Sequence, residues 1–224
     1  MQSYEVEIKS LLGSEEKAED LRKKMQEVDP SSTLTSRNTQ LNHYFIGGAM
    51  AGLVKTMEGH LSFETLKQLN DLILRVVEVS VRTRKKGDTV YLVVKASVGD
   101  DTSANGVARM EFEEQVDLTL EQLDRLLLKA GFRYQAKWSR EREEYVVKGV
   151  TVTLDKNAGY GWLAEFEKVV SSADLLDSAR AEVIQLMRLC GAEELPQARL
   201  ERMFAFYNAH WPEYYGTEKI FTVL

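Results

Sequence analysis

Cysteine and histidine are scarce in this chain of 224 residues. The single cysteine, Cys190, excludes an internal disulfide, and its apolar helical neighbours predict a buried core thiol rather than a nucleophile. The three histidines, His43, His60 and His210, are too scattered to predict a zinc site or a catalytic triad. Each histidine is better explained as a structural residue.

Proline is scarce as well, and long apolar runs are absent. Three prolines argue against long disordered linkers, and no apolar run approaches the roughly 20 residues that span a bilayer. The first residues lack the basic and apolar regions of a signal peptide. We therefore expect a cytoplasmic protein that makes no membrane contact.

The net charge is −6, from 35 acidic and 29 basic residues, which argues against a nucleic acid or an anionic membrane as the partner. An anionic small molecule is still compatible with this charge, because a local cluster of lysine and arginine decides what a pocket binds. The composition, 44% hydrophobic and 29% charged, is that of a globular protein that can bury a sizeable core. Walker loops, dinucleotide fingerprints and nucleophile elbows are absent from the sequence.

What the chain does have is charge at every second position of several strand-like segments. Side chains two apart on a strand point to the same face, and in the segments that begin at Glu5, Arg109 and Glu165 apolar residues fill the positions between the charges. The charged sets are Glu5/Glu7/Lys9, Arg82/Arg84, Arg109/Glu111/Glu113, Arg140/Arg142 and Glu165/Glu167. Charges of both signs that recur on most strands suit a closed barrel whose lumen holds a charged ligand and metal ions. The alternative for any one pair is an exposed cross-strand ion pair.

Hydrophobic periodicity predicts eight strands and five helices. The strands are expected at residues 3–11, 37–46, 76–85, 89–97, 107–116, 132–143, 145–154 and 162–170, and the segment 145–154 is expected to turn near Lys148-Gly149. The helices are expected at residues 14–28, 62–74, 119–130, 173–190 and 196–211, with Ser14, Ser62 and Thr119 as N-caps. Gly47, Gly48 and Gly52 predict a loop, and Lys86-Gly87-Asp88 predicts a hairpin turn.

These elements predict an α+β fold, an eight-stranded antiparallel β-barrel with helices packed outside. Closure of the barrel removes exposed strand edges. We expect residues 1–190 to form this domain and residues 191–224 to form a helical, aromatic-rich extension packed on it. The alternative for the extension is a dimer contact, which makes a homodimer a candidate, or a lid over the barrel mouth.

The carboxylates that share a strand face need compensation. Like-charged acids that face one cavity are unstable unless metal ions or basic side chains neutralise them. Oxygen ligands without histidine or cysteine favour Mg²⁺ or Mn²⁺ over zinc. The pairs Glu5/Glu7 and Glu165/Glu167, with Asp155 at the end of a strand, therefore predict a site for Mg²⁺ or Mn²⁺.

Basic residues accompany these acids on the predicted strands. Lys95 is the most informative, because its strand is otherwise apolar, so that the lysine either extends from an edge or points into a wet lumen. Several arginine and lysine side chains that converge from different strands match the oxygens of a polyphosphate.

The order of these residues along the chain resembles that of the CYTH superfamily, also called triphosphate tunnel metalloenzymes. Glu5-x-Glu7-x-Lys9 resembles its ExExK signature. The other matching segments are Gln40 to Phe45, with Asn42 where the family has an acid, Arg82-x-Arg84, Lys95, Arg109-x-Glu111-x-Glu113, Arg140-x-Arg142-x-x-Tyr145, with Arg140 where the family has lysine, Leu154-Asp155 and Glu165-x-Glu167. The segment from Ile46 to Leu74 is longer than the turn that many members have there.

The resemblance implies an eight-stranded tunnel that holds a small triphosphate and a divalent metal ion, Mg²⁺ or Mn²⁺. It assigns phosphate binding to Lys9, Arg82, Arg84, Lys95, Arg140 and Arg142. It assigns metal binding, directly or through water, to Glu5, Glu7, Asp155, Glu165 and Glu167, with Glu111 or Glu113 contributing. Glu7, Lys9, Glu165 and Glu167 are then the catalytic candidates.

Three functions are compatible with these residues. The preferred one is metal-dependent hydrolysis of a small triphosphate, which is inorganic triphosphate, a nucleoside triphosphate or thiamine triphosphate. The second is a class IV adenylyl cyclase that makes cyclic AMP from ATP, and the third is a non-catalytic module that binds polyphosphate or nucleotide. Trp138 or Trp162 could stack on a base or a thiamine ring, but core packing is preferred for both.

Overall fold

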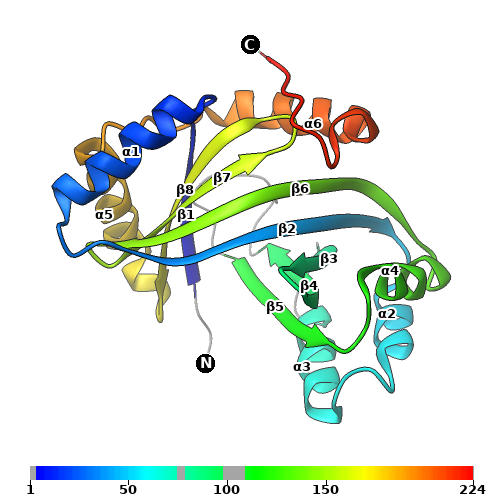
Figure 1. The fold of residues 1–224 in the computed structure, drawn as a ribbon. Coiled ribbons are helices and arrows are strands. Elements are labelled where there is room, and N and C mark those ends of the chain that lie inside the picture. The colour runs from blue at the N-terminus through cyan, green and yellow to red at the C-terminus, as the bar shows by residue number, and fades with distance from the viewer. Residues whose placement is uncertain (1–3, 75–78, 98–108, 224) are drawn as a thin grey trace. The chain divides into compact units, whose positions relative to one another are not determined.

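The computed structural model describes residues 4–74, 79–97 and 109–223, without the side chains of residues 96, 97, 109–111 and 173. The chain forms two compact units (Figure 1). Unit 1 combines Met1–Thr39 with Ser139–Leu224, and unit 2 combines Gln40–Thr102 with Arg109–Trp138. No helix among the described residues is both long enough and apolar enough to cross a membrane.

The strands form one eight-stranded sheet in the order β1-β8-β7-β6-β2-β3-β4-β5. Their bounds are β1 Tyr4–Leu11, β2 Thr33–Gly47, β3 Val79–Lys86, β4 Thr89–Ser97, β5 Arg109–Val116, β6 Phe132–Val147, β7 Val150–Asn157 and β8 Gly161–Val170. Adjacent strands with a defined register are antiparallel, and the long strands β2 and β6 each contribute to both units. The predicted α+β class and its eight antiparallel strands are therefore confirmed.

Six α-helices accompany the sheet in the described residues. They are α1 Glu15–Val28, α2 Met50–Met57, α3 Phe63–Ile73, α4 Leu120–Lys129, α5 Leu176–Leu189 and α6 Gln197–Tyr214. The predicted N-caps of three of them are confirmed, because Ser14, Ser62 and Thr119 each accept a hydrogen bond from a backbone N–H three residues on. At α4 the Gln122 side chain also accepts from the Thr119 backbone N–H, which completes a capping box.

Two sequence predictions of local structure are wrong. Gly52, which the sequence predicts in a loop, lies in helix α2. The chain turns before this helix at Gly47 and Gly48, which have positive φ angles of 72° and 70°. The helix forms because Leu53 and Met57, both 0% exposed, bury one of its faces. The strand break predicted near Glu144 is absent, since β6 continues to Val147. The turn predicted near Lys148-Gly149 is confirmed, because these two residues separate β6 from β7. The predicted starts at residues 76–78 and 107–108 lie outside the described residues.

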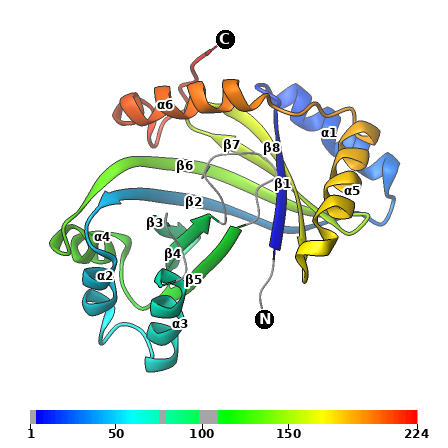
Figure 2. The ribbon, with the colours of Figure 1, turned by 180° about the vertical axis from the view of Figure 1, so that it is seen from behind.

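The core of unit 1 lies between the strands and the helices α1 and α5, which cover the same face of β1 and β8 (Figures 1 and 2). This face is apolar because every second residue of the strands is apolar. The residues packed there include Ile8, Val152, Leu154, Phe166, Leu21, Met25, Val183, Leu186 and Cys190. The aromatic side chains of α6 and the chain beyond it pack on the same unit, with Tyr207 against Tyr160 and Phe221.

The core of unit 2 lies between β2–β5 and the helices α2, α3 and α4, which are grouped together in Figure 1. Its strand residues again occupy alternate positions. They include Phe45, Val81, Val90, Leu92, Val94, Phe112 and Val116, and the helices add Leu53, Met57, Leu69, Leu120, Leu123 and Leu127. In both units helices cover the apolar face. Most charged residues of the strands lie on the opposite face, and Glu143 of β6 is an exception that contacts Arg22 of α1.

The loop at Gly159 is a point of close packing that gives a stability prediction. Gly159 has φ of +85°, and a Cβ there would lie 2.7 Å from the fully buried ring of Tyr207 and 2.9 Å from Phe221. We expect Gly159→Ala to lower the free energy of unfolding by about 2–4 kcal/mol, since it adds overpacking to backbone strain. Gly216→Ala is the control: its φ is +72° with nothing described within 4 Å, so only about 1 kcal/mol of strain is expected. Equal losses in denaturant titrations would contradict the packing argument.

The burial of Cys190, predicted from the sequence, is confirmed. Desolvation raises the pKa of this thiol to about 11 from an ordinary value of 9.0. Its stabilising contribution is therefore complete below pH 9 and is lost between pH 9 and 11, where the unfolded chain gives up the proton first. We expect iodoacetamide at pH 8 to modify Cys190 in denaturant but not in the native protein. Between pH 9 and 11, the unfolding free energy of Cys190→Ala should fall less steeply than that of the parent chain.

Candidate functional site

The register of the strands places the predicted charges of unit 1 on one face of the sheet. Lys9 pairs with Glu165, Glu7 with Glu167, and Arg142 with Asp155, and cross-strand partners point to the same side. This face, called the acidic face below, carries Glu5, Glu7, Lys9, Arg140, Arg142, Glu144, Asp155, Glu165 and Glu167. Carboxylates outnumber cationic side chains on it, which leaves an excess of negative charge.

At the centre of the acidic face, Arg142 joins two carboxylates. Its Nε and Nη2 donate to the two oxygens of Asp155 at 2.7 and 2.6 Å, and Nη2 also donates to Glu165 at 2.5 Å. Arg140 donates to Asp155 at 2.9 Å. Asp155 is 0% exposed, so two arginines hold a carboxylate that water does not reach.

These contacts shift the pKa values of the cluster. Burial alone would raise the pKa of Glu165, but the charges of Arg142, Lys9 and Arg140 outweigh it and hold that pKa well below its usual range. Burial likewise opposes the charge of Arg142, yet Asp155 and Glu165 raise the pKa of the guanidinium. Glu165 and Arg142 therefore both stay charged at neutral pH.

Three carboxylates gather beside this cluster. Glu5, Glu7 and Glu167 each offer an oxygen, and these oxygens lie within 4.8 Å of one another. The ammonium group of Lys9 contacts Glu7 and lies 3.7 Å from Glu165, so it joins the carboxylate group to the Arg142 cluster. All three acids are half-buried. Close, half-buried oxygens of this kind form the ligand set that Mg²⁺ or Mn²⁺ prefers.

The charged face of unit 2, called the basic face below, is dominated by cations. Its described charged residues are Arg82, Arg84, Lys86, Lys95 and Glu113. Arg84 donates from Nε to Asn42 at 2.8 Å and from Nη1 to both oxygens of Glu113 at 2.9 and 3.0 Å. The guanidinium of Arg82 lies 4.3 Å from the centre of the Tyr44 ring. Both arginines are thus held in place by neighbouring side chains.

Lys95 is on this same face, opposite Glu111 in the register of β4 and β5. It is half-buried, in keeping with a lysine that lies among partners rather than at a free edge. The side chains of Arg109 and Glu111 lie outside the described residues, so the structure places only their backbone positions on β5.

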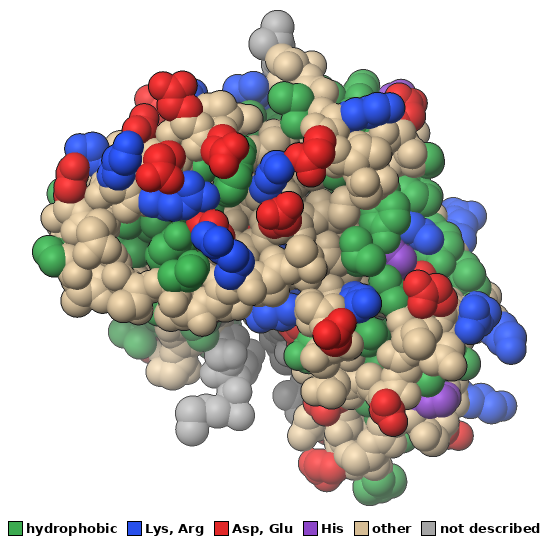
Figure 3. Space-filling model, viewed as in Figure 1, with side chains coloured by type: hydrophobic (Ala, Val, Ile, Leu, Met, Phe, Trp, Pro, Cys, Tyr) green, Lys and Arg blue, Asp and Glu red, His purple; other side chains and the backbone are tan. Residues whose placement is uncertain are grey.

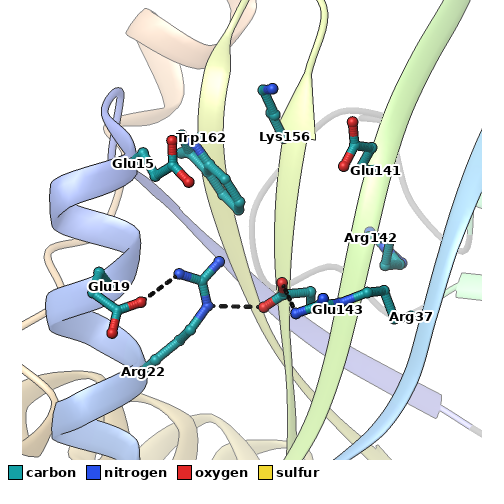
Figure 4. A pocket seen from close by; sticks show the side chains of 9 residues that line it. All are labelled: Glu15, Glu19, Arg22, Arg37, Glu141, Arg142, Glu143, Lys156 and Trp162. Atoms are coloured by element: carbon teal, nitrogen blue, oxygen red, sulfur yellow. Dashed lines mark hydrogen bonds and ion pairs between the residues drawn. The ribbon is translucent and has the colours of Figure 1, made fainter.

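A separate pocket of about 380 Å³ lies in unit 1 on the side of the sheet that carries α1 (Figure 4). Arg22 bridges Glu19 and Glu143 there, each at 2.9 Å, and its guanidinium lies 5.1 Å from the Trp162 ring centre. Acidic and basic side chains intermingle on this surface (Figure 3). Its arginines are paired with acids, which makes it an ion-pair network on the face opposite Glu165 and Glu167.

The structure groups the predicted site residues into two sets. Unit 1 brings together Glu5, Glu7, Lys9, Arg140, Arg142, Asp155, Glu165 and Glu167, and unit 2 brings together Arg82, Arg84, Lys95 and Glu113. Sequence reasoning missed Asn42 and Tyr44 as partners of the arginines. Their spacing of two on β2 was the available signal, because it puts both on one face.

The family model of the CYTH domain matches residues 63–199, more than half of the chain. The matched range includes β3 to β8 and excludes β1, which carries Glu5, Glu7 and Lys9. No curated protein matches the sequence significantly.

Solved structures share the fold at low identity. A conserved hypothetical protein of Pyrococcus furiosus has 17% identity and a TM-score of 0.60, with 87% of this chain and 98% of that chain covered. A candidate adenylate cyclase of Vibrio parahaemolyticus has 13% identity and a TM-score of 0.59, with 90% and 99% covered. HpAC1 of Hippeastrum, a candidate adenylyl cyclase described as having a dominant triphosphatase activity, has 15% identity and a TM-score of 0.54, with 92% and 96% covered.

Proposed function

The chain belongs to the CYTH domain family, and on that premise we propose that it is a metal-dependent enzyme that hydrolyses a small triphosphate. Members of the superfamily are typically triphosphatases and generally depend on a divalent metal ion. The observation that carries the proposal is the carboxylate group Glu5, Glu7 and Glu167 beside a cluster of basic side chains, Lys9, Arg140 and Arg142. Acids for a metal ion and bases for phosphate lie together on one face.

The carboxylate group fits a divalent metal ion. Its donors are oxygens alone, they lie within 4.8 Å of one another, and they carry the negative charge that a hard cation neutralises. Glu5, Glu7 and Glu167 would hold Mg²⁺ or Mn²⁺, with Glu165 reaching it through water. When bound, the metal ion neutralises charge on the phosphate oxygens and lowers the pKa of a water molecule.

The basic residues of the proposal bind and orient phosphate groups. Arg140 and Arg142 are preorganised, because Asp155 fixes both guanidinium groups, and we assign Asp155 to this role rather than to direct metal binding. Arg82 and Arg84 of unit 2 are likewise held by Tyr44 and Asn42. Planar guanidinium groups fixed in this way match phosphate oxygens at little entropic cost. Lys9 and Lys95 supply compact point charges.

A tunnel completes the proposal. The resemblance to the triphosphate tunnel metalloenzymes implies that the eight strands close into a tunnel, and we propose that Glu7, Lys9 and Glu165 face its bore. Water exclusion in such a bore strengthens every charge interaction with the phosphates. An acidic side chain, Glu7, Glu165 or Glu167, would orient the attacking water as a general base.

The test is a product analysis. Purified protein is incubated separately with inorganic triphosphate, ATP and thiamine triphosphate, each with Mg²⁺ or Mn²⁺, and every product is identified. We expect release of inorganic phosphate and loss of activity when the metal ion is chelated. If cyclic AMP is the main product from ATP, the enzyme is an adenylyl cyclase and the proposed hydrolysis is wrong. Triphosphate binding without turnover under both metal ions would reduce the protein to a binding module.

A further inference from the structure

A buried hydrogen-bond network lies in unit 2 on the helix-covered side of the sheet. Asp124 of α4, 3% exposed, accepts on one oxygen from Thr83 at 2.6 Å. Its other oxygen accepts from the Tyr134 hydroxyl at 2.7 Å and contacts His43 Nδ1 at 2.7 Å. A carboxylate can only accept, so His43 carries its proton on Nδ1. One helical side chain therefore holds residues of three strands.

The place of this network in the register connects it with the basic face. His43 and Thr83 are cross-strand partners on β2 and β3. The pair on one side of them is Asn42 with Arg84, and the pair on the other side is Tyr44 with Arg82. Successive residues of a strand point to opposite faces. Asp124 therefore binds the side chains of His43 and Thr83, which lie between these pairs and point to the face opposite the arginines.

We propose that Asp124 is a positioning residue that fixes the direction of Arg82 and Arg84 for phosphate binding. It acts along two routes. Thr83 anchors the β3 backbone from which both arginines project, and His43 anchors the β2 backbone that carries their partners Asn42 and Tyr44. The inference rests on the proposed function in one respect, that the two arginines bind the triphosphate.

A carboxylate suits this task better than its neutral analogues. Three donors converge on Asp124, and two acceptor oxygens are needed to receive them from different strands. Burial would raise the pKa of Asp124, but the hydrogen bonds of His43, Thr83 and Tyr134 outweigh it and lower the pKa. Asp124 is therefore charged, and both of its oxygens accept hydrogen bonds, which makes the network rigid.

The test compares Thr83→Val and Asp124→Asn with the parent chain. Thr83→Val removes one hydroxyl at nearly constant volume, and Asp124→Asn leaves a single acceptor oxygen for the three donors. Glu121→Gln is the matched control, because Glu121 is an exposed acid on the same helix. The measurements are kcat and KM for inorganic triphosphate with Mg²⁺, and the NMR hydrogen-exchange rate of the Arg84 Nε–H, which donates to Asn42.

We expect Asp124→Asn to raise KM about tenfold and Thr83→Val about fivefold, with kcat changed less than about twofold, because misplaced arginines weaken binding of the whole substrate. The Arg84 Nε–H should exchange faster in both variants and be unchanged in Glu121→Gln. An unchanged Nε–H exchange rate in both variants overturns the inference, whatever the activity. A parent chain without triphosphate turnover or binding ends the proposed function instead, and faster Nε–H exchange would still support the positioning role.

Discussion

Glu7→Gln is expected to reduce triphosphate turnover about 10³-fold while the protein stays folded. Glu7 belongs to the carboxylate group with Glu5 and Glu167, and its charge would be shared between the metal ion and Lys9. Glutamine keeps the size of the side chain but removes this charge. A loss of about 4 kcal/mol in transition-state stabilisation corresponds to that factor. Steady-state rates with Mg²⁺ and Mn²⁺ measure the effect, and circular dichroism monitors the fold.

The control for this variant is Glu141→Gln. Glu141 is an exposed acid of β6 that points to the opposite face from Arg140 and Arg142, so its loss should leave turnover within about twofold of the parent chain. A metal titration adds a second readout, since Glu7→Gln should need more Mg²⁺ for half-maximal activity. Equal activity of Glu7→Gln and the parent chain at every metal concentration would show that Glu7 has no role in metal binding or catalysis.

Arg142→Met is expected to lower the free energy of unfolding by about 3–5 kcal/mol at pH 7, the largest stability effect among these variants. Methionine fills similar space but leaves Asp155, which is 0% exposed, and Glu165 without their main partner. Arg140 alone then remains on Asp155. Denaturant titration measures the loss. Adding Asp155→Asn should recover part of it, because one uncompensated buried charge is removed.

The effect of Arg142→Met should depend on pH in a defined direction. Arg142 is the largest favourable influence that lowers the pKa of Glu165 in the parent chain, so this stabilisation is present above the ordinary pKa of 4.5 and is lost as the pH falls through the folded value. The difference between variant and parent should therefore shrink from pH 7 to pH 3. A difference that stays constant over this range would contradict the ion-cluster explanation.

Arg37→Met is the matched control for the arginine variant. The side chain of Arg37 is 67% exposed, and its partner Glu143 keeps hydrogen bonds from Arg22 and Tyr145. Because the Arg37 side chain lies mostly in water, its ion pair contributes about 1 kcal/mol or less, so Arg37→Met should have little effect on the free energy of unfolding. The contrast separates the loss of a buried arginine from the loss of an exposed one.

Local patterns predicted much of this protein because strand and helix periodicity are local properties. Glu5, Glu7 and Lys9 share a face for the simple reason that they are two residues apart, and register confirms this. The helix starts at Ser14 and Thr119 were predictable because the side-chain oxygen of each residue accepts a hydrogen bond from a backbone N–H in the first turn, which has no partner inside the helix. Helix α2 was not predicted because Gly47 and Gly48 precede it and Gly52 lies within it, and the burial of Leu53 and Met57 is a tertiary effect.

The sequence by itself determined the alternation of charged and apolar faces, the number of strands and the residue types available for metal and phosphate. Tertiary structure alone decided which charges meet. Asp155 receives Arg140 and Arg142, while Glu5 and Glu7 gather with Glu167, more than 150 positions along the chain. Asp124 was invisible in the sequence, since its partner Thr83 is 41 residues away and its helix shows only an amphipathic pattern. Which charged side chains pair depends on strand register and on how the helices pack, and the residue spacing within a single segment predicts neither.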